Sequence, residues 1–157
     1  MELPIFSHAG FHRNAAEVPF HRHAGSELIL VLRGGCVIES VHGRFEGKPG
    51  ELLVIPPGVS HNQVNISNEA NLYCVFQAET ALFQSNWRVI GTEGAPRIRR
   101  LMLELWHMTA ANDLTGAEGI LYSLLCALRG LEERHSKFTT LPPFQAAGFE
   151  AGARLSA

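Results

Sequence analysis

Residues 21–34 read HRHAGSELILVLRG, and this stretch decides the fold. His21, His23 and Glu27 stand an even number of residues apart, so on an extended chain their side chains point to the same face. The residues that follow Glu27 are apolar at consecutive positions, which is typical of a strand covered on both faces. The stretch therefore predicts a buried strand that begins beside an inward-facing polar group, with a further layer packed on its outside.

Short runs rich in β-branched and aromatic residues fill the first half of the chain, to about Gln77. The predicted strands are residues 17–23, 27–32, 36–42, 52–55, 62–66 and 72–77. Glycine and proline separate them at 33–35, 47–50 and 56–58, where glycine supplies positive φ and proline fixes φ. This pattern indicates an all-β barrel or sandwich, which we place at residues 1–80.

The hydrophobic period changes in the second half, where residues 95–135 predict two helices in a hairpin. Pro96 suits the first turn of the first helix. Thr115 and Glu118 form a capping-box pattern that predicts the start of the second helix. The apolar stripe of the second helix consists of Leu121, Leu124, Leu125, Leu128 and Leu131, widened by Ile120 and Tyr122.

This apolar arc is wider than a surface helix needs. Periodicity alone leaves two interpretations open: a hairpin that lies on the barrel of its own chain, or helices that pair two subunits. We expect the helices to form a homodimer. Residues 136–157 are rich in Gly, Ala, Ser, Thr and Pro, which predicts a linker or tail.

Composition excludes several classes of function. The 157 residues fit one domain with a small appendage, and 13 basic against 15 acidic residues give no general attraction to nucleic acids or anionic membranes. No run reaches the roughly 18 apolar residues of a membrane span. Cys36, Cys74 and Cys126 are odd in number and far apart, which predicts reduced thiols rather than a disulfide framework or zinc ribbon. We expect a cytoplasmic protein that does not bind membranes.

A fourth polar residue, His61, follows the tight turn at 56–58, from which the next strand can bring it across the barrel to His21, His23 and Glu27. Three imidazoles and one carboxylate suit a divalent first-row metal such as Zn, Fe, Mn, Ni, Co or Cu, and do not choose among them. The alternative is a hydrogen-bonded polar cluster that lines a pocket. Nothing in the sequence marks a nucleophile, so we assign no catalytic residue.

Two blocks of sequence match the motifs of the cupin superfamily. The first, H-x-H-x(3)-E-x(6)-G, runs over residues 21–34, and the second, G-x(5)-P-x-G-x(2)-H-x(3)-N, runs over residues 50–65. The chain departs from the first motif only at Ala15, where a glycine is usual. The resemblance implies a mainly β fold, a double-stranded β-helix or jelly-roll barrel, followed here by the helical hairpin. It also implies that His21, His23, Glu27 and His61 match the family's metal ligands.

The chain as a whole resembles the N-terminal sensing and dimerisation domain of AraC-type transcription regulators. The segments at 20–23, 27–34 and 49–61 are similar in style to those domains, and the two helices fit their layout. This resemblance implies a small-molecule effector bound in the barrel by residues that the sequence does not identify. It also implies that DNA is bound only through a helix-turn-helix domain, which is absent from this chain.

Two alternatives remain open. The four-ligand set and the absent DNA-binding region fit a small metal-dependent cupin enzyme, such as a dioxygenase or an isomerase. A storage or scaffold cupin without a ligand is the third interpretation. The helices after the barrel favour the sensing domain over an enzyme.

Overall fold

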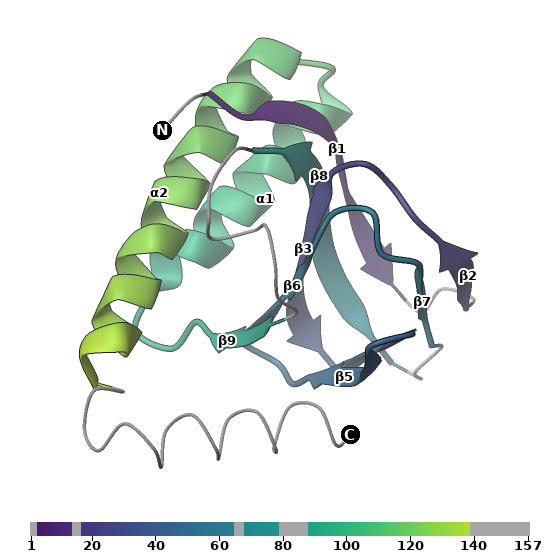
Figure 1. The fold of residues 1–157 in the computed structure, drawn as a ribbon. Helices are drawn as coiled ribbons and strands as arrows, with labels where there is room; N and C mark the ends of the chain where they lie inside the picture. Colours follow the sequence, from purple (N-terminus) through teal and green to yellow (C-terminus); the bar gives the residue numbers. More distant parts are fainter. Residues whose placement is uncertain (1–2, 14–16, 65–67, 79–87, 139–157) are drawn as a thin grey trace.

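The computed structural model describes residues 3–13, 17–64, 68–78 and 88–138 (Figure 1). Its elements, in chain order, are β1 (Ile5–Arg13), β2 (Val18–His21), β3 (Ser26–Arg33), β4 (Cys36–Ser40), β5 (Gly43–Gly47), β6 (Glu51–Ile55), β7 (His61–Gln63), β8 (Ala70–Gln77), β9 (Arg88–Gly91), α1 (Pro96–Ala110) and α2 (Leu114–Phe138). The predicted barrel followed by a helical hairpin is confirmed.

The strands form two antiparallel sheets that face each other. The larger sheet has the order β1-β8-β3-β6-β9, and the smaller one has the order β2-β7-β4-β5. Apolar side chains from both sheets fill the space between them, and Val31, Ile38 and Phe45 are almost fully buried there.

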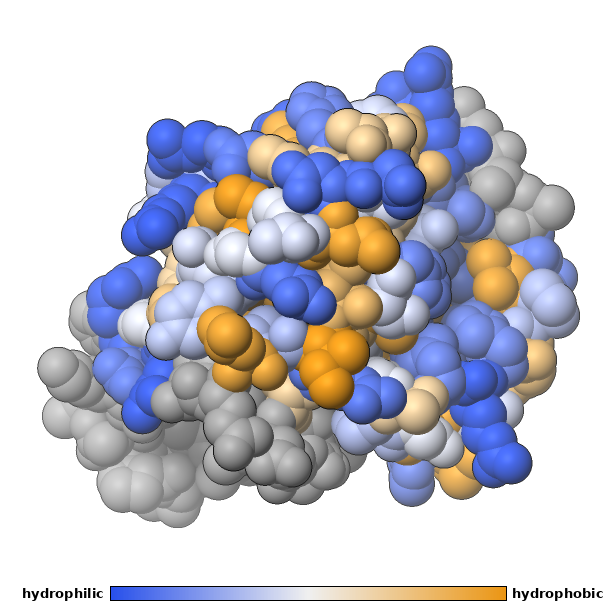
Figure 2. All heavy atoms as spheres, turned by 90° about the horizontal axis from the view of Figure 1, so that it is seen from above, coloured by the Kyte–Doolittle hydropathy of each residue, from blue (hydrophilic) through white to orange (hydrophobic). Residues whose placement is uncertain are grey.

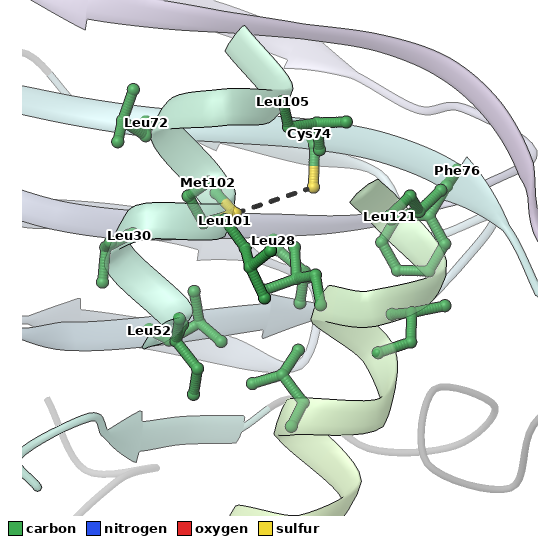
Figure 3. Close-up of a cluster of buried hydrophobic side chains, with 14 of the residues drawn as sticks. Leu28, Leu30, Leu52, Leu72, Cys74, Phe76, Leu101, Met102, Leu105 and Leu121 are labelled. Carbon is green, nitrogen blue, oxygen red and sulfur yellow. Dashed lines mark hydrogen bonds between the residues drawn. The ribbon is translucent and has the colours of Figure 1, made fainter. Parts of the chain in front are cut away.

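Strand β3 is covered on both faces, as its consecutive apolar residues predict. Ile29 and Val31 point into the barrel, whereas Leu28 and Leu30 belong to a second cluster beneath the helices. The second cluster lies between the larger sheet and the hairpin, and Cys74 Sγ lies 4.0 Å from Met102 Sδ within it (Figure 3). The molecule therefore has three layers: helices, larger sheet and smaller sheet (Figure 1).

The hairpin begins where proline predicts it, with Pro96 in the first turn of α1. Asn112 ends α1 at a positive φ of 58°, and the N–H groups of Asn112 and Asp113 donate to Thr109 and Met108. This is the Schellman arrangement of a helix C-terminus. The predicted capping box is wrong: α2 starts one residue before Thr115, and the Asp113 carboxylate accepts the Gly116 N–H at 2.8 Å instead.

The apolar stripe of α2 is buried within the chain. All five of its leucines are at most 3% exposed, and they pack against α1 and the larger sheet. Helix α2 runs to Phe138, so it includes the first residues of the segment predicted as a tail, and residues 139–157 lie outside the described part. Seen from above, separate hydrophobic residues lie among hydrophilic ones (Figure 2).

Three strands, β1, β5 and β9, were not predicted. β1 mixes polar and small residues, and β5 is flanked by glycines, so neither shows an apolar run. β9 has four residues and is held by pairing with β6. Tertiary pairing rather than local propensity makes these segments strands. Among the described residues, no helix is long and apolar enough to cross a membrane.

Candidate metal centre

The four residues singled out by their spacing come together at one end of the barrel. His21 ends β2, His23 lies in the loop before β3, Glu27 is the second residue of β3, and His61 begins β7 opposite His21. Their ligand atoms all lie within 4.8 Å of one another. The predicted convergence is therefore present in the structure, and two stretches of the chain supply it, residues 21–27 and the start of β7.

Distances within this group suit a common metal ion. Oε2 of Glu27 lies 3.0 Å from Nε2 of His23 and 3.1 Å from Nε2 of His61. The ring centroids of His21 and His61 are 4.5 Å apart. Neighbouring ligands at metal distances of roughly 2.1 Å and right angles would stand about 3 Å apart. The residues present thus fit a divalent ion, and the sequence motifs predicted the same four.

Backbone carbonyls orient all three imidazoles. Nδ1 of His21 lies 2.9 Å from the Pro19 carbonyl oxygen, and Nδ1 of His61 lies 2.8 Å from that of Val59. Nδ1 of His23 lies 2.8 Å from the Gly25 carbonyl oxygen. A carbonyl oxygen only accepts, so each Nδ1 carries the proton and donates it. In the neutral rings, each Nε2 therefore presents a lone pair to the centre, as in histidines that bind metals.

Burial and charge act on these groups together. Burial raises the pKa of the Glu27 carboxyl, but hydrogen bonds from His23 and His61 outweigh it and lower that pKa to about 2. The hydrogen bond to Glu27 raises the pKa of His23 against the opposing effect of its burial. Without a metal, the protein thus holds a proton between an imidazole and a carboxylate. A divalent cation would take the place of that proton.

Local backbone geometry fixes the loop that carries His23. A Cβ atom at Gly25 would stand 2.4 Å from the carbonyl oxygen of Phe76, so only glycine allows β3 to begin so close to β8. The N–H of Gly58, at a φ of +76°, donates to the His23 carbonyl at 2.9 Å. The turn of the second motif thereby supports a histidine of the first.

Gln63, Tyr73 and Phe76 are further candidates to line the barrel. Whether each side chain points inward depends on the strand register, which cannot be predicted from the sequence. Gln63 and Tyr73 face the barrel interior, whereas Phe76 packs beneath the helices. Burial and the nearby charge of Glu27 raise the pKa of the Tyr73 hydroxyl. Asn65, the last residue of the second motif, lies outside the described residues.

A second polar group inside the barrel was not predicted. It comprises His12, Gln63, Glu69 and Asn71, and is called the inner cluster below. Gln63 and the imidazole of His12 are hydrogen-bonded at 3.1 Å, and the same imidazole lies 3.4 Å from Glu69. No spacing pattern predicts it, because its residues belong to three strands or their ends and are brought together only by strand pairing.

The cysteines carry no candidate site. Cys36, Cys74 and Cys126 are free, as predicted, and the first two are buried whereas Cys126 is exposed. Burial raises the pKa of the Cys36 and Cys74 thiols far above their usual range. Such thiols are poor nucleophiles and poor metal ligands.

Comparison with known families identifies the barrel. Residues 8–76 match the family model described as the Cupin domain. The matched segment is somewhat less than half of the chain, and it contains all four residues of the centre. A search of curated proteins found no match. Together with its two antiparallel sheets, the match shows that the barrel has the cupin fold.

Several solved structures are similar to part of this chain. A cupin-2 domain containing protein from Shewanella frigidimarina has 25% identity over 48% of this chain and 71% of that chain, with a TM-score of 0.38. A protein from Neisseria meningitidis has 15% identity over 47% and 83%, with a TM-score of 0.41. An oxalate decarboxylase variant from Bacillus subtilis has 20% identity over 52% and 22%, with a TM-score of 0.35.

Proposed function

We propose that this chain, whose residues 8–76 form a cupin domain, is the ligand-sensing and dimerisation domain of an AraC-type transcription regulator. In this function, His21, His23, Glu27 and His61 hold a divalent metal, and a small effector binds beside it in the barrel. The helical hairpin joins two copies, and a separate domain binds DNA.

The orientation of the imidazoles is the observation that carries the metal part of this proposal. Three Nδ1–H groups donate to backbone carbonyls, so the Nε2 atoms of the three rings and a carboxylate meet at one point. In the metal-free protein, a proton in the contacts of Glu27 with His23 and His61 supplies positive charge among these atoms. A bound divalent ion supplies that charge, along with Lewis acidity and open positions for an oxygen ligand.

Access and connectivity support the sensing part. His21 is exposed, so a small molecule can reach the centre from solvent. Glu27 stands at the start of β3, and the next residue on that strand, Leu28, packs in the cluster beneath the helices. A change at Glu27 is therefore one residue away from the layer that would join subunits.

A screen for binding without turnover tests this function. Metal-loaded protein is incubated with small carbohydrates and organic acids, and thermal stability and ligand mass are both followed. We expect one chemical class to raise the melting temperature and to be recovered unchanged. The reading frame beyond Ala157 is a second test, because a regulator should continue with about a hundred residues of helix-turn-helix pattern. A frame that stops there would contradict the regulator.

The second candidate is a metal-dependent cupin enzyme of the dioxygenase or isomerase class. The observation that favours it is the open side of the centre, where His21 is exposed and a substrate could reach the metal. The same screen separates the two candidates. Conversion of a compound by the metal-loaded wild type, lost in Glu27→Gln, would establish the enzyme and overturn the sensor.

A further inference from the structure

The inner cluster is distinct from the metal centre. Along β8, Asn71 stands opposite Val31, whereas Val75 stands opposite Glu27. Four strand residues span about 13 Å. The aromatic ring of Tyr73 lies at the level between them. Asn71 and Glu27 therefore occupy different levels of the same barrel, and Gln63 follows His61 by two residues on β7.

Strand pairing brings the four side chains of the inner cluster together. His12 of β1 lies directly opposite Asn71 of β8, so their side chains are neighbours on the inner face. Glu69 precedes Asn71 by two residues and shares that face. Nδ1 of His12 lies 3.4 Å from Oε1 of Glu69 and 3.1 Å from the side-chain amide nitrogen of Gln63.

Asn71 is the unusual member of this group. Its side chain is 0% exposed, and neither its amide nitrogen nor its amide oxygen has a hydrogen-bond partner among the residues that the structure describes. A buried polar group left in this state costs about 1–3 kcal/mol. Leu72, Cys74 and Phe76 point to the opposite face, so alternation directs the Asn71 amide into the inner cluster beside His12 and Glu69.

The donor chemistry favours a cation over an organic molecule. Asn71 and Glu69 are completely buried, so an organic molecule cannot reach them from solvent. Glu69 contributes a carboxylate to the cluster, 3.4 Å from the imidazole of His12. Rotation of the Gln63 amide exchanges its nitrogen and oxygen, and these cannot be told apart by shape. One imidazole, one carboxylate and two amide oxygens can then converge.

We propose that His12, Gln63, Glu69 and Asn71 form a second, interior site for a divalent first-row cation. The separations of 3.1 Å between His12 and Gln63 and 3.4 Å between His12 and Glu69 suit neighbouring ligands of one ion as well as they suit hydrogen bonds. An imidazole among oxygen ligands favours Mn²⁺, Zn²⁺ or Co²⁺ over Ca²⁺ and Mg²⁺. His12, 18% exposed at its side chain, provides the entry point.

Titration with Mn²⁺, followed by electron paramagnetic resonance of the free ion, tests this site in the metal-stripped full chain. Wild type should bind two ions up to millimolar Mn²⁺. The double variant Glu27→Gln/His61→Ala should retain one ion, at the interior site. Asn71→Leu should also retain one, at the centre, and that remaining ion shows that the variant is folded.

A variant that should bind the interior ion more tightly complements the variants that lose an ion. Asn71→Asp adds a second carboxylate, so the interior ion should bind about tenfold tighter. The proposal is overturned if wild type binds a single ion that Glu27→Gln/His61→Ala abolishes. It is equally overturned if Asn71→Leu still binds two ions, or if Asn71→Asp leaves the affinity of the second unchanged.

Discussion

Three imidazoles in this barrel donate their Nδ1–H groups to backbone carbonyls within two residues of themselves. Each ring is therefore oriented by its own loop or strand, before any ligand is bound. Glu27, on β3, supplies a carboxylate that is hydrogen-bonded to His23 and His61. At the scale of single residues, the centre is preorganised for a cation.

The proton in the metal-free centre gives a first prediction. The pKa of His23 is raised above 6.5, so its contribution to stability is complete below pH 6.5 and is lost as pH rises through the raised value. The pKa of Glu27 is lowered from 4.5 to about 2, so its contribution is complete above pH 4.5 and is lost as pH falls toward 2. Together these groups stabilise the metal-free protein most between pH 4.5 and 6.5.

Bound metal reverses the dependence of stability on pH above about pH 6, because the ligands must lose protons to bind it. From pH 6 to about pH 8, the melting temperature should fall by a few degrees with a chelator and rise with saturating Zn²⁺. Thermal unfolding followed by circular dichroism measures both. Parallel pH profiles with and without metal would contradict the shared site.

Gly25 gives a second prediction. In Gly25→Ala, the added methyl group meets the Phe76 carbonyl oxygen, which belongs to the backbone and cannot turn away. We expect a loss of roughly 1–3 kcal/mol in unfolding free energy and weaker metal binding, because the carbonyl that orients His23 must move. Gly91→Ala is the matched control, since no described residue beyond its chain neighbours lies within 4 Å of its new atom. Equal behaviour of the two variants would refute this role.

At the scale of elements, the helix start shows what the sequence could and could not predict. Thr115 and Glu118 fit a capping box by spacing, yet Asp113 performs the capping. The reason is the Schellman end of α1, whose positive φ at Asn112 places Asp113 at the right point for a cap. The spacing pattern carried no information on how the preceding helix ends.

Capping by Asp113 gives a third prediction. Asp113→Ala should lower the unfolding free energy by about 1 kcal/mol, equivalent to roughly 2–4 °C in melting temperature. Thr115→Ala should change it by less than about 0.5 kcal/mol, because Thr115 is an exposed residue of the first turn. Chemical denaturation of the two variants decides, and a larger effect of Thr115→Ala would restore the capping box.

Some strands could likewise be predicted from the sequence, and others could not. β3, β4, β6 and β8 carry apolar runs and were predicted to within two residues at each end. β1 became a strand only because β8 offers it a partner along its length. The four residues of the centre could be found because each motif fixes its spacing locally. The inner cluster could not be found from the sequence, because His12 and Asn71 are far apart in the chain and only the pairing of β1 with β8 brings them together.

At the scale of the whole molecule, the larger sheet connects the barrel interior to the helical hairpin. Its inner face carries Glu27 and the barrel interior, and its outer face packs against the hairpin. Because the leucine stripe of α2 is buried within the chain, the proposed dimer would use the remaining surface of the helices. On α2 that surface includes Gly119, Tyr122 and Cys126.

Dimerisation gives a fourth prediction. Gel filtration with light scattering should show a mass twice the 17.2 kDa of one chain. Tyr122→Arg should produce a monomer with an unchanged circular dichroism spectrum, since Tyr122 is only partly buried within the chain. Arg44→Glu, a substitution on β5 of the smaller sheet, should remain a dimer. A wild type that stays monomeric at high concentration would contradict the hairpin's role in pairing.

The most direct test of the account is the metal content of the centre. Protein purified without a metal-affinity tag is incubated with each candidate divalent metal, desalted and examined by elemental analysis, alongside Glu27→Gln/His61→Ala and, as a control, exposed His42→Ala. We predict at least one tightly held metal per chain in wild type and His42→Ala, and one fewer in the double variant. Equal metal content in all three proteins, or none in wild type, would contradict the metal centre.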